Sequence, residues 1–335
     1  IHGTGVKLIP RALAAFGFTN IIHVPEQDVV SGDFPTVVSP NPEEPAALAM
    51  AVAKAKETDA ELVLASDPDA DRVGAAVKNN EGEWVLLNGN QTALMFVYYL
   101  ITRWKELGKI KGKEYIVKTI VTTETIKTIA DRNGVGFYDV YTGFKWIANV
   151  MKQNEGKLKY IGGGEESYGF LCEDFVRDKD AVSACAVLAE IAAWAKDQGM
   201  TMYQLLQKIY VEYGFSKEKG ISVVKKGKSG AEEIEAMMKH FRENPLKEIA
   251  GSKVTAFYDY STLKGIDYLE NETLTLDMPV TSNVLQFFTE DGTKVSIRPS
   301  GTEPKIKFYC EVHSKVNSVE ELPAADKAAT EKIEA

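Results

Sequence analysis

Strand-like apolar runs alternate with helical segments through residues 1–205, and this alternation limits the possible folds more than any other feature. Residues 60–66 (AELVLAS) form a short apolar run with strand character, and residues 20–25 (NIIHVP) show a similar pattern. Between them, residues 39–58 open with prolines, which a first helical turn tolerates, and then become helical. Such alternation predicts an α/β domain over residues 1–88.

A second domain of the same class is predicted over residues 89–205. Its most distinct elements are a helix at residues 88–108, a strand at 114–123 and a long apolar helix at 180–199. Strand and helix runs are instead segregated over residues 206–335, which is typical of an α+β domain. The sequence therefore predicts two consecutive α/β domains followed by an α+β C-terminal domain.

The composition argues against several classes of function. With 39 Lys and Arg against 48 Asp and Glu, the formal net charge is -9, so no basic face is available overall for nucleic acid. The longest apolar run, residues 93–101, is far shorter than a membrane span. Cys172, Cys185 and Cys310 are widely spaced, which indicates buried thiols in a reducing cytoplasm and no disulfide framework. We therefore expect a cytoplasmic protein that binds neither nucleic acid nor membrane.

A group of three aspartates follows the predicted strand at residues 60–66. Asp67, Asp69 and Asp71 are spaced by two, and an extended backbone would place their carboxylates on one side. Close carboxylates repel one another unless a cation lies between them, and a hard ion that leaves room for a phosphate oxygen suits Mg²⁺. The pattern therefore favours a magnesium site over an acidic, solvated turn. On spacing alone, Arg72 is equally consistent with a structural ion-pair partner and with a phosphate ligand.

A glycine-rich loop, GGGEESYGF at residues 162–170, follows another predicted strand. Its three leading glycines allow a sharp turn and a close approach of the backbone to a ligand. Glu165 and Ser167 then offer an acceptor and a donor–acceptor at the strand end, which suits the binding of neighbouring hydroxyls. A tight turn with incidental acidic residues is an equally good interpretation of this loop alone.

Two lysines are candidates with weaker support. Lys145 lies near the start of a predicted helix in YTGFKWI. A solubilising surface lysine is the simpler interpretation, and a mobile cation for a phosphoryl group is the functional one. Lys179 lies between Asp178 and Asp180, which alone indicates an ion-paired loop. We keep Lys145 as a catalytic candidate and Lys179 as a substrate-binding candidate.

The segment RPSGTEPKIKFY, residues 298–309, combines a Ser-Gly-Thr turn with several cations. The turn would bend backbone N–H groups inward, the hydroxyls add donors, and the arginine fork matches phosphate. In the strand that follows the turn, Lys307 lies on the face opposite to that of Ile306. A phosphate-binding loop is favoured over a plain hairpin turn, and its candidate ligands are Arg298, Ser300, Gly301, Thr302 and Lys307.

These loops fall one in each predicted domain. Together they indicate a phosphosugar site with a metal at a cleft between domains. One alternative is a Mg²⁺ phosphatase of the haloacid dehalogenase type with Asp67 as nucleophile, against which Asp71, Arg72 and the other loops argue. A non-catalytic phosphosugar-binding protein is a second alternative.

The strings DPDADR, TGFK, GEESYG and RPSGTEPKIKFY, in this order and spacing, resemble the signature loops of the α-D-phosphohexomutases. The resemblance is greatest to the phosphoglucomutase branch, and IHGTG and FPTVVSPNPEE also resemble the second domain of the family. It covers essentially the whole chain, but only the second to fourth of four family domains. Phosphomannomutase is the close alternative, although Glu166 and Tyr168 favour glucose.

The resemblance implies a role for each loop. The three aspartates would bind Mg²⁺, with Arg72, Lys145 and His2 near the reaction centre. The glycine-rich loop would hold sugar hydroxyls, and the RPSGT loop would bind the phosphate that is not transferred. In the intact enzyme a phosphoserine donates its phosphoryl group to a hexose monophosphate, and the resulting hexose 1,6-bisphosphate turns around before the other phosphoryl group returns to the serine.

The family's phosphoserine segment has no counterpart in this chain, since Ser39 in SPNPEE is not followed by His. The chain begins Ile-His-Gly-Thr-Gly, without an initiator Met and inside sequence that already has structural character. We therefore expect part of a phosphoglucomutase that lacks its N-terminal phosphoserine domain. Such a chain would take part in interconverting glucose 1-phosphate and glucose 6-phosphate within the intact protein and would be inactive alone.

Overall fold

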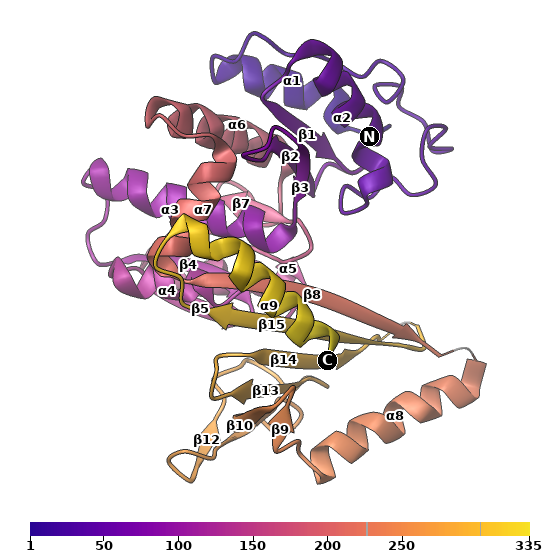
Figure 1. Ribbon diagram of the computed structural model, residues 1–335, viewed down its shortest axis with the longest axis vertical. Helices are drawn as coiled ribbons and strands as arrows, with labels where there is room; N and C mark the ends of the chain where they lie inside the picture. Colours follow the sequence, from indigo (N-terminus) through magenta and orange to yellow (C-terminus); the bar gives the residue numbers. More distant parts are fainter. Residues whose placement is uncertain (226, 302) are drawn as a thin grey trace. The chain divides into compact units, whose positions relative to one another are not determined.

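The structure, a computed structural model, describes residues 1–225, 227–301 and 303–335 (Figure 1). These residues form two compact units, 1–209 and 210–335. Helix α7 (Met202–Tyr213) carries the chain from the first unit into the second.

The N-terminal part of the first unit contains two helices and a small antiparallel sheet in the order β1-β2-β3. Helix α2 packs on this sheet because its small apolar residues, Ala47, Leu48 and Ala55, share one core with Val63 and Ala76. The elements are α1 (Gly5–Ala15), α2 (Pro45–Thr58), β1 (Leu62–Ser66), β2 (Val73–Lys78) and β3 (Trp84–Leu87).

Residues 20–25, which the sequence predicted as a strand, form no regular element. A strand needs a hydrogen-bonded neighbour, and no strand that the structure describes lies beside this segment. Within the same described residues, β1 is the edge strand of its sheet and pairs with β2 alone. The strand prediction was therefore wrong here, and β2 was not anticipated.

A four-stranded sheet forms the remainder of the first unit, in the order β5-β4-β6-β7. Strand β4 is parallel to both β5 and β6, whereas β7 is antiparallel to β6. Parallel neighbours need crossover connections, and helices α4 (Thr125–Arg132) and α5 (Phe144–Asn154) supply them. The strands are β4 (Glu114–Thr119), β5 (Gly136–Val140), β6 (Lys159–Gly164) and β7 (Phe170–Cys172).

The helices around this sheet are α3 (Gly89–Glu106), α4 (Thr125–Arg132), α5 (Phe144–Asn154) and α6 (Ala181–Asp197). Helix α3 is held against the sheet and against α6 by aromatic contacts. Phe96 stacks on Phe170 with ring centroids 4.3 Å apart, and Tyr99 meets the edge of Trp194 at 5.4 Å. Among the described residues, no helix combines the length and the apolar character needed to cross a bilayer.

The second unit is built on an eight-stranded antiparallel sheet in the order β12-β11-β10-β13-β14-β15-β8, with β9 paired to β10. Ile234 and Met238 of α8 pack against strand residues such as Phe257 and Phe287 in one apolar core. The strands are β8 (Phe215–Val224), β9 (Glu248–Ile249), β10 (Ser252–Asp259), β11 (Lys264–Asp267), β12 (Glu272–Thr275), β13 (Leu285–Thr289), β14 (Lys294–Pro299) and β15 (Lys305–Ser314). The helices are α8 (Gly227–Glu243), a 3-10 turn η1 (Val319–Glu321) and α9 (Leu322–Glu334).

The predicted fold class is confirmed, because α/β segments precede a segregated α+β segment. The predicted boundary at residue 88 lies inside the first compact unit, so the division of that unit into two domains stays a prediction. All three cysteines are free: Cys172 and Cys185 are buried, whereas Cys310 is partly exposed. Burial raises the pKa of Cys185 to about 12, so this thiol is unreactive.

Candidate functional site

The three aspartates predicted to bind metal lie in a turn directly after β1. The backbone turns at Ala70, whose φ of 57° is in the left-handed region and whose N–H donates to the Asp67 carbonyl at 3.1 Å. Asp67 Oδ1 also accepts the N–H groups of Asp71 and Arg72, each at 3.0 Å. The carboxylates therefore converge through a closed turn and not through the extended backbone that the sequence predicted.

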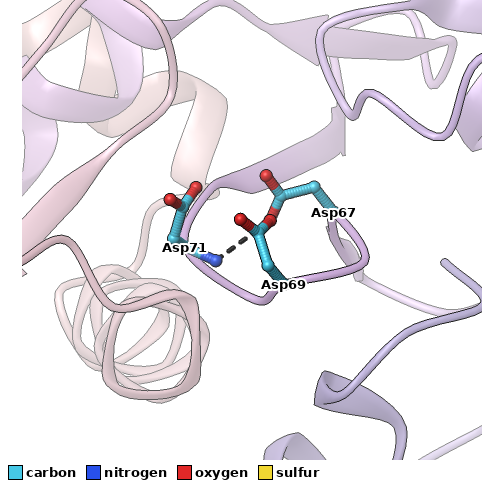
Figure 2. A group of neighbouring side chains, drawn as sticks. All are labelled: Asp67, Asp69 and Asp71. Atoms are coloured by element: carbon cyan, nitrogen blue, oxygen red, sulfur yellow. Dashed lines mark hydrogen bonds between the residues drawn. The ribbon is translucent and has the colours of Figure 1, made fainter.

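The carboxylates lie close enough together to share a cation (Figure 2). One oxygen from each of Asp67, Asp69 and Asp71 lies within 4.8 Å of the others. Opposite ligands of Mg²⁺ are about 4 Å apart, so a small closure of the loop would fit all three around one ion. Burial, with the charges of Asp71 and Asp69, raises the pKa of Asp67 to about 6 against its backbone hydrogen bonds. A divalent cation would relieve this repulsion, so the donor set fits a hard metal ion.

Two cations lie beside the aspartates. Arg72 Nε is buried without a hydrogen-bond partner and lies 3.8 Å from both Asp67 Oδ2 and Asp71 Oδ1. Another guanidinium nitrogen of Arg72 lies 3.5 Å from Glu43 Oε1. Lys179 forms an ion pair directly with Asp71. Burial alone lowers the pKa of Lys179, but the hydrogen bond and charge of Asp71 raise it overall, so the lysine is held as a cation.

The aspartate loop is connected to the glycine-rich loop. Arg72 forms a β-bridge with Gly169, and the N–H of Val73 donates to the Tyr168 carbonyl at 3.0 Å. A Cβ atom at Gly169 would lie 2.4 Å from Cδ of Lys179, so the glycine makes room for the lysine chain. Tyr168 has a φ of 67°, a conformation that costs energy in a bulky residue. The two loops therefore form one connected structure.

Glu165 joins the glycine-rich loop to the start of α5. It is buried, with 4% of its surface exposed, and its Oε1 accepts the N–H of Gly143 at 2.7 Å. Burial raises the pKa of Glu165, the Gly143 bond opposes this, and the charge of Glu166 adds to the rise. Lys145, two residues beyond Gly143, is exposed, and its Nζ lies 5.1 Å from the ring centre of Trp146. The hydrogen bond from Gly143 to Glu165 therefore places the start of α5, the helix that carries Lys145, beside the glycine-rich loop.

Glu166 is fixed by two threonines that the sequence reasoning missed. Its Oε2 accepts the hydroxyls of Thr119 and Thr122 at 3.0 and 3.3 Å, and its N–H donates to Thr122 Oγ1 at 3.2 Å. Both threonines lie at the carboxyl end of β4, which is parallel to the β6 strand that leads into this loop. The sequence signal that could have pointed to these two threonines was the presence of polar residues at the ends of neighbouring parallel strands. Ser167, the next residue, is partly exposed.

His2 lies in the N-terminal segment and is buried. Its Nδ1 lies 2.8 Å from the Val29 carbonyl, and its Nε2 lies 2.7 Å from Thr36 Oγ1. Both ring nitrogens are therefore engaged within residues 2–36, and no hydrogen bond described for this side chain reaches the aspartate loop. The catalytic role that the resemblance implies for His2 stays a prediction.

The phosphate-binding candidates lie in the second unit, where β14 meets β15. Arg298 and Lys307 are directly opposite each other in the antiparallel ladder. Both are partly exposed, and among the residues described neither has an acidic partner. Further along the same strand pair, Lys294 faces Glu311 and forms a buried ion pair at 3.0 Å. Like charges opposite each other destabilise a sheet, so the Arg298–Lys307 end is suited to an anion.

Ser300 and Gly301 belong to the turn between these strands. The N–H of Ser300 donates to the Lys305 carbonyl at 2.7 Å, and its Oγ accepts the N–H three residues on at 3.3 Å. The Ser300 N–H is therefore used within the turn. A Cβ atom at Gly301 would meet open space, and Thr302 lies outside the described residues. The positive charge of this candidate site comes from the strand pair and not from the turn.

Three domain descriptions of one family match this chain. They are phosphoglucomutase/phosphomannomutase alpha/beta/alpha domain II over residues 1–82, alpha/beta/alpha domain III over residues 88–213, and the C-terminal domain over residues 223–325. Phosphohexomutases, the class of protein that this family comprises, are isomerases. The chain belongs to the phosphoglucomutase/phosphomannomutase family, which confirms the resemblance seen in the sequence.

The curated relatives include phosphoglucomutases of staphylococci. The phosphoglucomutase of Staphylococcus aureus (strain MRSA252) is 37% identical over 309 residues, which cover 92% of this chain and 55% of the relative. That of Staphylococcus haemolyticus (strain JCSC1435) is 34% identical over the same shares. The chain therefore spans about half the length of these relatives.

Solved structures share the fold. A putative phosphomannomutase from Thermus thermophilus has a TM-score of 0.63 at 19% identity, covering 100% of this chain and 59% of that one. A phosphoglucomutase/phosphomannomutase family protein from Burkholderia thailandensis has a TM-score of 0.62 at 19% identity, with 98% and 60% covered. At this identity the likeness shows the fold alone.

Proposed function

We propose that this chain supplies the metal-, sugar- and phosphate-binding parts of a phosphoglucomutase, which interconverts glucose 1-phosphate and glucose 6-phosphate. The observation that carries the proposal is the connection of the aspartate loop to the glycine-rich loop, through the Arg72–Gly169 bridge and the Lys179–Asp71 ion pair. This connection gathers clustered carboxylates, two cations and the buried Glu165. Phosphoryl transfer needs such a set, because it is catalysed mainly by positioning and by stabilisation of charge.

Asp67, Asp69 and Asp71 would hold Mg²⁺. A bound Mg²⁺ would neutralise charge on a phosphoryl oxygen. Arg72 and Lys179 would add positive charge at the same place, and Lys145 would bring a third cation from the start of α5. The buried position of Arg72 Nε, with no hydrogen bond made, leaves it a donor available for an oxygen.

Glu165 and Ser167 would bind neighbouring hydroxyls of the sugar. Oε1 of Glu165 holds the Gly143 N–H, so its second oxygen would be the one that accepts from a hydroxyl. The two threonine bonds to Glu166 support this role, because they fix the loop before any ligand arrives.

Arg298 and Lys307 would bind the phosphate that is not transferred. A hexose 1,6-bisphosphate that turns around presents this site with either phosphate, so the site must recognise phosphate and not the carbon that bears it. A pair of cations on adjacent strands meets this need, with Arg298 adding a bidentate fork.

The nucleophile would be a phosphoserine on an N-terminal domain that is not part of this chain. The chain alone would then bind hexose phosphates without turnover. Phosphomannomutase is the alternative within the family, since the family description covers both activities.

The test combines binding with turnover. Calorimetry with Mg²⁺ should show that the chain binds glucose 1-phosphate and glucose 6-phosphate more tightly than mannose 6-phosphate. An assay with catalytic glucose 1,6-bisphosphate should show no turnover. Absence of hexose phosphate binding would refute the proposed sugar- and phosphate-binding sites. Tighter binding of mannose 6-phosphate than of the glucose phosphates would favour the phosphomannomutase activity. Robust turnover by a preparation whose mass matches this chain would refute the external phosphoserine.

A further inference from the structure

Residues 39–45 (SPNPEEP) pack against β2 directly ahead of helix α2. Pro42 is buried in this contact. A Cβ atom at Gly74 of β2 would lie 2.8 Å from both the Cβ and the carbonyl oxygen of Pro42, so only a glycine lets the two segments come this close. The close fit therefore places the next residue, Glu43, beside the start of β2.

The backbone around Glu43 is fixed by two turns. Its N–H donates to Asn41 Oδ1 at 3.1 Å, and the N–H of the following residue donates to the Asn41 carbonyl at 3.0 Å. An asparagine side chain that accepts the N–H two residues on acts as a turn. Pro45 then begins α2, where its fixed φ suits the first helical position. Glu43 is thus held in place on both sides and is not carried on a free loop.

The side chain of Glu43 meets Arg72. Arg72 directly precedes β2 and lies two residues before Gly74, so both positions face the same side of the strand. This is the side that Pro42 covers. Oε1 of Glu43 lies 3.5 Å from a guanidinium nitrogen of Arg72, and about a third of each side chain is exposed. The contact therefore follows from the packing of the segment on β2.

Arg72 lies among three carboxylates that come from two different segments. Its Nε is 3.8 Å from an oxygen of Asp67 and from one of Asp71, and among the described residues this buried nitrogen has no hydrogen-bond partner. Asp67 and Asp71 belong to the cluster that could hold a metal ion. Glu43, the third carboxylate, lies outside that cluster.

A cation bound by the aspartates would compete with Arg72 for them. A bound divalent ion is the largest local charge in its site, so carboxylates that bind it attract a neighbouring guanidinium less. Of the three carboxylates around Arg72, Glu43 alone would keep its full charge for the arginine. Without Glu43, Arg72 would depend on the aspartates and would oppose binding of the cation.

We propose that Glu43 is a positioning residue for Arg72, which it holds beside the aspartate loop when a cation occupies that loop. Glu43 thereby strengthens metal binding without being a ligand, and it keeps the Arg72 Nε in place as a donor. This inference rests on the metal site of the proposed function. It gives the SPNPEEP segment a role at that site.

The test is calorimetric titration with Mg²⁺ of the wild-type chain and of variants that separate the contact from the charge. Glu43→Gln removes both. Glu43→Asp keeps the charge but is one methylene shorter, so it no longer reaches Arg72. Glu44→Gln is the matched control, because it removes the same charge from the next residue, which is exposed. Glu43→Gln is also made in an Arg72→Gln chain, and melting temperatures check that each variant folds.

Glu43→Gln and Glu43→Asp should each weaken Mg²⁺ binding about two- to fivefold, the range expected for one partly exposed ion pair. Glu44→Gln should bind as the wild type does, and Glu43→Gln should have no effect in the Arg72→Gln chain. Wild-type affinity in either Glu43 variant, or an equal loss with and without Arg72, would overturn the inference and leave the metal site intact. A wild-type chain that binds no Mg²⁺ would refute the metal site and this inference together.

Discussion

Lys179 donates a hydrogen bond to Asp71, a residue 108 positions earlier in the chain. The lysine directly precedes the capping residue of α6, Asp180, whose carboxylate accepts the N–H groups of Val182 and Ser183 at 3.3 and 2.9 Å. The helix start therefore fixes the lysine backbone, and its ammonium neutralises one of three clustered carboxylates. We infer that Lys179 is a built-in counter-charge of the aspartate loop.

Lys179→Met should destabilise the metal-free protein by about 1.5–3 kcal/mol, the usual cost of a lost charged hydrogen bond. Mg²⁺ should then raise the melting temperature more in the variant than in the wild type, because the ion replaces the missing charge. Thermal unfolding with and without Mg²⁺ measures both effects. Lys159→Met, which breaks an exposed pair with Asp174, is the control and should change little. An equal or smaller effect of Mg²⁺ in the Lys179 variant would contradict the role.

Asp69→Asn should weaken Mg²⁺ binding while the fold is retained, because a ligand is lost and carboxylate repulsion is relieved at the same time. Calorimetric titration measures the affinity, and circular dichroism checks the fold. Asp131→Asn, an exposed change in α4, is the matched control and should bind as the wild type does. Unchanged Mg²⁺ affinity in the Asp69 variant would show that Asp69 is not a ligand of the metal.

Arg298→Ala should weaken glucose 1-phosphate and glucose 6-phosphate by similar factors and leave unphosphorylated glucose unaffected. The expected loss is about 1.5–3 kcal/mol for each monophosphate. Arg298→Lys should recover only part of it, because a point charge lacks the bidentate fork. Lys253→Ala, an exposed change in the same unit, is the control. An effect on only one monophosphate would show that the site recognises part of the sugar as well as the phosphate.

Glu114 gives a prediction for acid conditions. Its carboxylate accepts the N–H groups of Lys111, Gly112 and Lys113 at 2.7, 2.9 and 3.1 Å. Burial acts to raise its pKa, but these bonds lower it overall. Because the pKa is lower in the folded than in the unfolded state, ionised Glu114 stabilises the fold above its unfolded pKa. That contribution is lost as the pH falls through the folded pKa.

Glu114→Gln should therefore cost about 1 kcal/mol of stability at neutral pH, and the difference from the wild type should shrink in acid. Urea unfolding across this pH range measures it. Glu81→Gln, which removes an exposed carboxylate, is the control and should show no such pH dependence. A difference that stayed constant down to strong acid would mean that ionisation of Glu114 is not its cause.

Local sequence patterns correctly predicted those features that depend only on residues close by in the chain. The aspartates follow an apolar strand as predicted, and the strands and helices of residues 89–205 match the sequence pattern closely. The predicted backbone between Asp67 and Asp71 was wrong, because the pattern could not show that Ala70 adopts a left-handed conformation.

Features that depend on distant partners could not be predicted. Residues 20–25 have strand character, but pairing decides whether a strand forms, and the partner is not encoded nearby. Polar residues at the strand ends could have marked Thr122 as a candidate, but its contact with Glu166 depends on β4 lying beside β6. The sequence placed Lys307 on the outer face of its strand, but only the register of β14 and β15 shows that it faces Arg298.

Gly169 determines what kind of damage a mutation at the loop would cause. A methyl group there would press on the middle of a flexible lysine side chain, which can swing aside, and not on backbone. A Gly169→Ala allele should therefore yield a folded protein whose lysine is displaced from Asp71 and which is destabilised to about the same extent as Lys179→Met. In genetic terms, alleles at positions 169 and 179 would share one phenotype, and the effect of the first would disappear in a background that already lacks Lys179.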